Sequence, residues 1–187
     1  MLELLRRSQG RVIDPGIVPR WLSLLKQPAR GALYMAVITT RTACAPGVAG
    51  AVVGWAVDRG HLAVEDEPAA VTVLSEAIAN SIVHGSLGVL GMDAYVADPD
   101  GYFAGIDERL ADDDYGSRPI AILWRQAPGR LWLHVEDTGK GATEVGRQRP
   151  SCAPRLAGRG KKIMAAMAAH VRYSLNGRRT SIGFPHA

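Results

Sequence analysis

Apolar residues recur with a helical period near the middle of the chain. They stand at three- and four-residue steps, at Val71, Leu74, Ile78 and Ile82. This spacing predicts a helix that turns one face to a core. Glu76, Asn80 and His84 stand at four-residue steps on a different side of that helix, and residues four apart lie one above the other. The acidic run at 65–67 favours a helix start, and Gly85 is a candidate C-cap.

Other segments predict the rest of the elements. Strand formers occur at 32–40, 118–126, 130–137, 171–176 and 179–184, and helical patterns at 46–59, 99–112 and 160–170. Asn176-Gly177 between the last two strands indicates a hairpin. This order predicts an α+β fold, a two-layer α/β sandwich with a mixed sheet and helices on one face.

The chain of 187 residues is long enough for one domain with a proper core. Residues 1–31 are broken by glycine and proline, which indicates a helical appendage or a linker left from a longer protein. The apolar stretch 17–25 favours a homodimer helix as readily as a tether. The main domain is expected at 32–187, with an insert at 88–117 and a loop at 142–157.

Composition indicates an ordinary globular protein, with 47% hydrophobic and 21% charged residues. No apolar run has the length of a membrane span, and the first residues lack the apolar core of a signal peptide. Cys44 and Cys152 have no metal-ligand spacing and form no disulfide framework. We therefore expect a cytoplasmic protein with reduced thiols and no membrane partner.

Charge is unevenly distributed along the chain, whose net charge is +4. Residues 140–187 hold ten Lys or Arg against one acid, whereas residues 90–116 hold eight acids against Arg109. A basic third suits a polyanionic ligand. Only 6% of residues are aromatic and no nucleic-acid reading module is evident, so a triphosphate fits better than nucleic acid.

Two glycine-rich segments follow the central helix. The alternating strand at 130–137 runs into Asp137-Thr-Gly139-Lys-Gly141, and Gly158-Arg-Gly160-Lys opens the helix at 160–170. Glycine lets a backbone turn tightly and approach a ligand without a Cβ clash. Free N–H groups at a helix start favour phosphate.

In order and spacing, these three motifs resemble the N, G1 and G2 boxes of the GHKL (Bergerat-fold) ATPases. The resemblance extends over about residues 33–184. Within that superfamily, residues 75–85 are most similar to the compact anti-sigma-factor serine kinases (RsbW-like, SpoIIE-associated). The resemblance implies the Bergerat fold, with residues 142–157 as a short ATP lid.

The resemblance also implies ATP and Mg²⁺ as ligands and assigns roles to residues of the first two motifs. Asn80 would bind the Mg²⁺ that bridges the phosphates, and an amide oxygen is a suitable hard ligand. Glu76 would orient or deprotonate the attacking nucleophile. Asp137 would accept a hydrogen bond from the adenine amine and reject guanine, while Gly139 and Gly141 admit the base.

The third motif would hold the phosphates through the backbone of Gly158 and Gly160. Arg159 and Lys161 would add positive charge there. The family usually has an apolar residue where Lys161 stands, so either this lysine contacts phosphate or the helix docks differently. Thr180 matches a late threonine near the adenine pocket.

The expected function is that of an ATP-binding regulatory protein of bacterial signalling. Such a kinase phosphorylates a serine on a STAS-type anti-anti-sigma partner with MgATP, or sequesters a sigma factor. One alternative is a non-catalytic or degenerate GHKL adaptor. Another is the excised ATPase domain of a larger sensor kinase or phosphatase.

Overall fold

The computed structural model describes residues 1–26, 31–89, 95, 97–140 and 159–185. Its sheet contains six strands: β1 (Arg11–Ile13), β2 (Tyr34–Thr39), β3 (Pro119–Ala127), β4 (Arg130–Glu136), β5 (His170–Ser174) and β6 (Arg179–Pro185). Their spatial order is β1-β2-β3-β4-β6-β5. β1 pairs in parallel with β2, and the other pairs are antiparallel, so the sheet is mixed.

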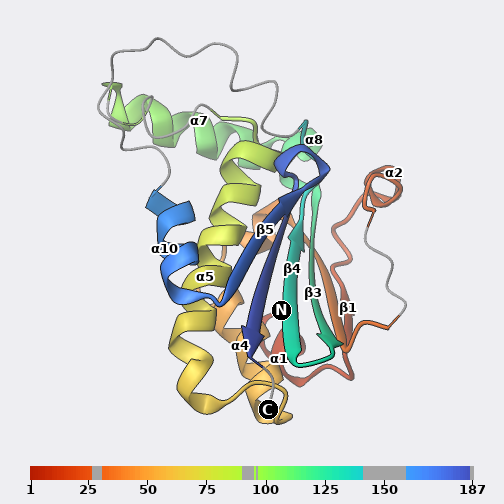
Figure 1. The fold of residues 1–187 in the computed structure, drawn as a ribbon. Coiled ribbons are helices and arrows are strands. Elements are labelled where there is room, and N and C mark those ends of the chain that lie inside the picture. Colours follow the sequence, from red (N-terminus) through yellow and green to blue (C-terminus); the bar gives the residue numbers. More distant parts are fainter. Residues whose placement is uncertain (27–30, 90–94, 96, 141–158, 186–187) are drawn as a thin grey trace.

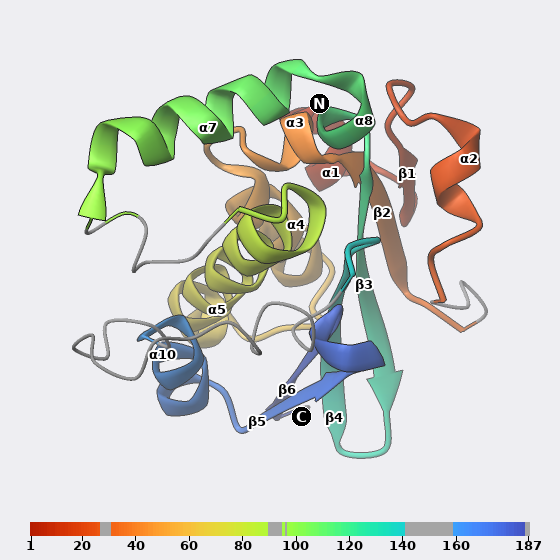
Figure 2. The same ribbon diagram turned by 90° about the horizontal axis from the view of Figure 1, so that it is seen from above.

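The longer helices are α4 (Val48–Asp58), α5 (Glu67–Asn80), α7 (Pro99–Ala111) and α10 (Arg159–Met167), and shorter ones are α1 (Leu2–Arg7), α2 (Pro19–Leu22), α3 (Thr40–Ala43) and α8 (Asp113–Gly116). A 3₁₀ turn (Val64–Asp66) leads into α5, and another (Leu175–Gly177) joins β5 to β6. Helices α4, α5 and α10 cover one face of the sheet (Figures 1 and 2). The fold is therefore α+β and compatible with a two-layer α/β sandwich, as predicted.

The core lies between the sheet and this helical layer. Along β4, Leu131, Leu133 and Val135 are fully buried. The residues between them, Trp132 and His134, are partly exposed, and Glu136 at the end of the strand is buried. On α5, Leu74, Ile78 and Ile82 belong to the same core, which confirms the predicted apolar face. Alternation of period two on the strands and a helical stripe on α5 thus meet in one cluster.

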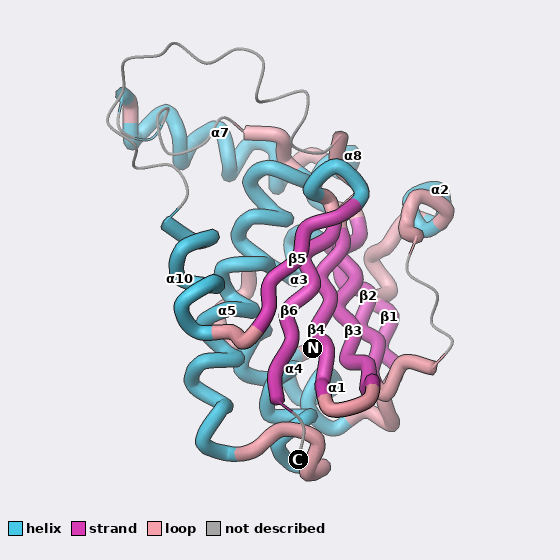
Figure 3. The backbone as a smooth tube through the Cα atoms, in the orientation of Figure 1, coloured by secondary structure: helices cyan, strands magenta, loops and turns pink. Residues whose placement is uncertain are grey.

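The strands predicted from the sequence lie where they were expected (Figure 3). Gly129 has φ of +67° between β3 and β4, and Asn176 and Gly177 have φ of +56° and +89° between β5 and β6. These left-handed conformations suit glycine and asparagine. Turn chemistry therefore sets both connections.

Residues 1–26 share the core and the sheet with the rest of the chain. Leu5 of α1 is fully buried against the helical layer, and its carbonyl accepts a hydrogen bond of 3.2 Å from the Tyr34 hydroxyl. Val12 in β1, a strand that the sequence analysis did not include, is also buried in that core. The N-terminal segment thus adds an edge strand to β2.

Helix α2 departs from the expectation that helices occupy one face. Figure 2 shows it on the side of the sheet opposite α4, α5 and α10. Just before α2, Ile17 is buried in a second small cluster with Val37, Ala121 and Leu123. Part of the apolar stretch expected to form a dimer helix or a tether is therefore used to cover β2 and β3 of its own sheet.

The insert contains the predicted helix as α7, followed by α8. Ile106 and Leu110 pack against the core, whereas Phe103 is 55% exposed. Arg118 fastens α8 to the end of the central helix, because its guanidinium donates to the carbonyls of Asp114 and Ser86, each at 2.7 Å. Within the described residues, no helix is long and apolar enough to cross a membrane.

Candidate nucleotide site

Helix α5 and the start of α10 bring the first and third sequence motifs together. Glu76 and Asn80 are both half-buried on α5. A Cβ built on Gly160 would overlap Glu76 Oε2 and lie 3.6 Å from Asn80 Nδ2. A side chain at position 160 would make the Glu76 carboxylate move, so the two helices meet at the predicted acid and amide.

The predicted row of Glu76, Asn80 and His84 does not continue as an α-helix. Residues Ser81–Ser86 form a π-helical segment, in which the Leu87 N–H donates to the Ile82 carbonyl at 2.8 Å. The wider turn takes His84 out of the four-residue register, and its side chain is exposed. Gly85 lies inside this segment, so the prediction that Gly85 caps the helix is wrong.

The π-helical segment contacts the end of β4. Asp137 follows the inward-facing Val135 by two residues, so its side chain continues the row on the helical side. The nearby Ser81 hydroxyl helps to lower the pKa of the Asp137 carboxyl. A Cβ on Gly85 would lie 2.5 Å from both Asp137 carboxylate oxygens. The carboxylate is thus enclosed by small residues of the first motif.

Burial controls the ionisation of Asp137, which is only 3% exposed. Loss of hydration raises its pKa to about 7. The Gly139 N–H donates to its Oδ1 at 2.8 Å. This bond, the charge of Arg178 and the nearby Ser81 hydroxyl lower the pKa without offsetting burial. A further hydrogen-bond donor would stabilise the charged form of such a carboxylate.

The second motif also packs directly on the first. A Cβ on Gly139 would overlap the Gly85 carbonyl and lie 2.7 Å from the Gly85 Cα. The hydroxyl of Thr138 is buried and has no hydrogen-bond partner among the described residues. This part of the structure combines a tight backbone approach with unused hydrogen-bonding capacity beside Asp137.

Thr180 is buried on β6, directly opposite Val135 of β4 and Tyr173 of β5. It therefore faces the helical side, and its partner Val135 lies two residues before Asp137. The Lys161 ammonium lies 5.0 Å from the centroid of the Tyr173 ring. In this structure Lys161 thus extends toward β5, the edge strand of the sheet.

Several predicted features lie outside the described part of the chain. They are Gly141, Gly158, Cys152 and the loop at 142–157 expected to form the lid. Arg159 begins α10, but its side chain is outside the described residues. The site as described therefore consists of Glu76, Asn80, Asp137, Gly139, Gly160 and Thr180 with their neighbours.

Sequence analysis missed the part played by Ser81 and Gly85. Both are small and buried, four residues apart on the segment that faces Asp137. Four-residue spacing of small residues is a weak signal by itself, because it also marks ordinary helix packing. Their contact with the carboxylate becomes visible only when β4 is placed against α5.

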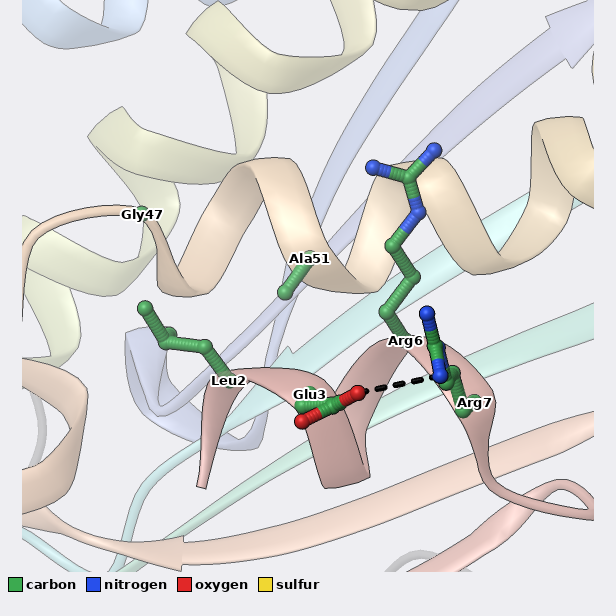
Figure 4. A pocket seen from close by; sticks show the side chains of 6 residues that line it. All are labelled: Leu2, Glu3, Arg6, Arg7, Gly47 and Ala51. Carbon is green, nitrogen blue, oxygen red and sulfur yellow. Dashed lines mark ion pairs between the residues drawn. The ribbon is translucent and has the colours of Figure 1, made fainter.

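Among the described residues, no group of three or more His, Cys, Asp or Glu side chains could hold a metal ion. A magnesium ion bound through one amide and ligand phosphates makes no such group. A hollow between α1 and α4 is lined by Leu2, Glu3, Arg6, Arg7, Gly47 and Ala51 (Figure 4). No predicted site residue lines it.

No family model and no curated protein matches this chain. A functional assignment therefore depends on the geometry of the site.

Proposed function

We propose that this chain binds MgATP in a GHKL-type pocket between α5, the end of β4 and α10. The observation that carries the proposal is the packing of Gly85 and Gly139 around the buried Asp137 carboxylate, together with the close approach of Gly160 to Glu76 and Asn80. The central helix and the segment that continues it thus contact both of the other segments at residues that the resemblance selects. An adenine site fits the close glycine contacts, the acid with a raised pKa and the Thr138 hydroxyl, which has no hydrogen-bond partner in the described part of the chain.

Each residue has a distinct proposed role. Asp137 would accept a hydrogen bond from the adenine amine, a donor that guanine lacks at that position. The Thr138 and Thr180 hydroxyls would complete the polar edge of the base site. Asn80 would hold Mg²⁺ through its amide oxygen, and the backbone at the start of α10 would face phosphate. MgATP supplies a transferable phosphoryl group when bound.

We further propose that the chain is a serine/threonine kinase of bacterial signalling whose substrate is a STAS-type anti-anti-sigma protein. Glu76 is half-buried beside Asn80 and has no ion pair among the described residues. A carboxylate in that position can accept the proton of a serine hydroxyl. The GHKL resemblance supports the STAS partner class, and a sigma factor is the other partner it supports.

Calorimetry with MgATP, MgADP and MgGTP at pH 8 tests nucleotide binding. We expect binding of both adenine nucleotides, weakened by Asn80→Ala and by Asp137→Asn, and no comparable binding of MgGTP. Asp100→Asn and Gln126→Ala are matched controls on exposed positions. A folded chain that binds no nucleotide at millimolar concentration would falsify the proposal.

A degenerate, non-catalytic adaptor is the second candidate. The Lys161 contact with Tyr173 favours it, because a charged residue there replaces the apolar residue usual in the family. Phosphate transfer from labelled ATP to a STAS-type serine separates the two functions. Transfer that Glu76→Gln abolishes while nucleotide still binds supports the kinase, and binding without transfer to any such protein supports the adaptor.

A further inference from the structure

Glu136, the last residue of β4, is a fully buried carboxylate on the face of the sheet opposite the candidate site. Strand register pairs it with Ala121 of β3 and with Arg179 of β6. Ala121 belongs to the small cluster that contains Ile17, so Glu136 lies beside the N-terminal segment on this face. A buried charge is costly unless it is paired and hydrogen-bonded, so the contacts of this carboxylate decide its role.

Each oxygen of the Glu136 carboxylate accepts hydrogen bonds from a different part of the chain. The Arg179 guanidinium donates to Oε2 through Nε at 3.0 Å and through Nη2 at 2.7 Å. The backbone N–H of Lys26, 110 residues earlier in the chain, donates to Oε1 at 2.5 Å. The carboxylate thus joins the end of β4 both to β6 and to the N-terminal segment.

The part of the N-terminal segment that reaches Glu136 is fixed to the sheet by further contacts. We call residues 17–26 the strap, which includes α2 and crosses the sheet on the side opposite α5 and α10 (Figure 2). Ile17 and Leu25 pack in the small cluster on β2 and β3. Two contacts with the segment before β3 also hold the strap, namely the ion pair Arg20–Asp114 and the Arg118 guanidinium 5.1 Å from the centroid of the Trp21 ring. The Lys26 N–H therefore comes from an anchored segment.

Asp137 follows Glu136 directly and turns its side chain to the helical face of the sheet. Its backbone N–H donates to the Arg178 carbonyl at 3.0 Å, and Arg178 directly precedes Arg179. Two successive residues of each chain segment thus bind each other, one pair through the backbone and the other through side chains. Because a rigid peptide unit links Glu136 to Asp137, a shift of the first residue must also move the second.

We infer that Glu136 is a positioning residue for the candidate base site, and that the strap contributes to this role through the Lys26 N–H. The inference rests on the proposed function, in which Asp137 contacts the adenine. From the opposite face of the sheet, Arg179 and Lys26 fix the end of β4, so the Asp137 carboxylate stays against Gly85. A buried ion pair adds little net stability compared with apolar packing, so fixing one arrangement of the chain accounts better for its burial.

Lys26→Pro and Lys26→Ala form a matched pair of variants that tests the inference. Proline has no backbone N–H and so removes the donor to Glu136, whereas alanine keeps the donor and changes only an exposed side chain. Glu136→Gln is the second variant, because it replaces one acceptor oxygen with a donor and leaves Arg179 or Lys26 without its partner. We expect Lys26→Pro and Glu136→Gln to weaken MgATP binding at least about tenfold in calorimetry, and Lys26→Ala to leave it unchanged.

The NMR amide resonance of Gly139 is a readout that needs no nucleotide, because this N–H donates to Asp137 Oδ1 at 2.8 Å. It should move in Lys26→Pro and Glu136→Gln and keep its wild-type position in Lys26→Ala, with circular dichroism to confirm folding of each variant. A resonance and an MgATP affinity that stay at wild-type values in the folded variants would overturn the inference and leave Glu136 a purely structural role. A wild-type chain that binds no nucleotide, but whose Gly139 resonance moves as expected in the variants, would reject the nucleotide proposal and support the positioning of Asp137.

Discussion

Gly85 and Asp137 are packed so closely that no side chain fits at position 85. A Cβ there would lie 2.5 Å from both oxygens of the Asp137 carboxylate. The contact joins the π-helical end of the central helix to the end of β4, 52 residues later in the chain. Both the shape and the ionisation of the candidate base site depend on it.

Replacing Gly85 with alanine should therefore damage the site. The added methyl group must displace Asp137 or the π-helical segment, and such overpacking costs about 1–3 kcal/mol of unfolding free energy. Urea denaturation measures the loss, and calorimetry with MgATP should show weakened binding. Gly50→Ala in α4 is the control, because a Cβ there meets nothing within 4 Å. An unchanged stability and affinity for Gly85→Ala would contradict the packing described.

Asp137 should make stability depend on pH in an identifiable range. Its pKa is raised from 3.8 to about 7 on folding, so the folded state retains a proton that the unfolded state has lost between these values. Unfolding free energy should thus fall as pH rises from about 4 to about 7, by at most about 4 kcal/mol, and then level off.

Denaturant titrations of the wild type and Asp137→Asn at several pH values check this. The substitution removes the titrating group, so the difference in unfolding free energy between the two proteins should change across that range. Asp100→Asn, at an exposed position, provides the comparison. Parallel pH profiles for wild type and Asp137→Asn would rule out a raised pKa at this residue.

Gly160→Ala should separate function from stability. The new Cβ would overlap Glu76 Oε2, which is the far end of a flexible side chain that can rotate away. We expect unfolding free energy to change by less than about 1 kcal/mol, whereas phosphate transfer, which needs Glu76 in place, should fall at least about tenfold. Gly105→Ala on α7, where a Cβ meets nothing within 4 Å, should leave transfer unchanged. A large loss of unfolding free energy would contradict this prediction and would show that Gly160 is needed for packing.

Leu5→Ala tests whether the N-terminal segment supports the main core. Leu5 is fully buried, and removing its isobutyl group should cost about 2–5 kcal/mol. Leu4→Ala is the neighbouring control, because Leu4 is 52% exposed and its loss should cost less than about 0.5 kcal/mol. Equal melting temperatures for the two variants would show that α1 does not contribute to the stability of the domain.

The sequence by itself determined the local elements and the candidate residues. Period-two alternation marked β4, a helical stripe marked α5, and Asn176-Gly177 marked the final turn, because these signals depend only on neighbouring residues. Asp137 and Gly139 could be selected because the chemistry of a strand end running into glycine is also local.

Tertiary structure alone decided which of these parts touch. Joining β1 to β2, and placing Ile17 on the opposite face, depends on contacts between distant residues that no local period encodes. The same holds for the π-helical widening, which accompanies the contacts of Ser81 and Gly85 with Asp137. Burial of that carboxylate, and hence its pKa, follows from the packing of the helix on the sheet and is a property of the folded protein.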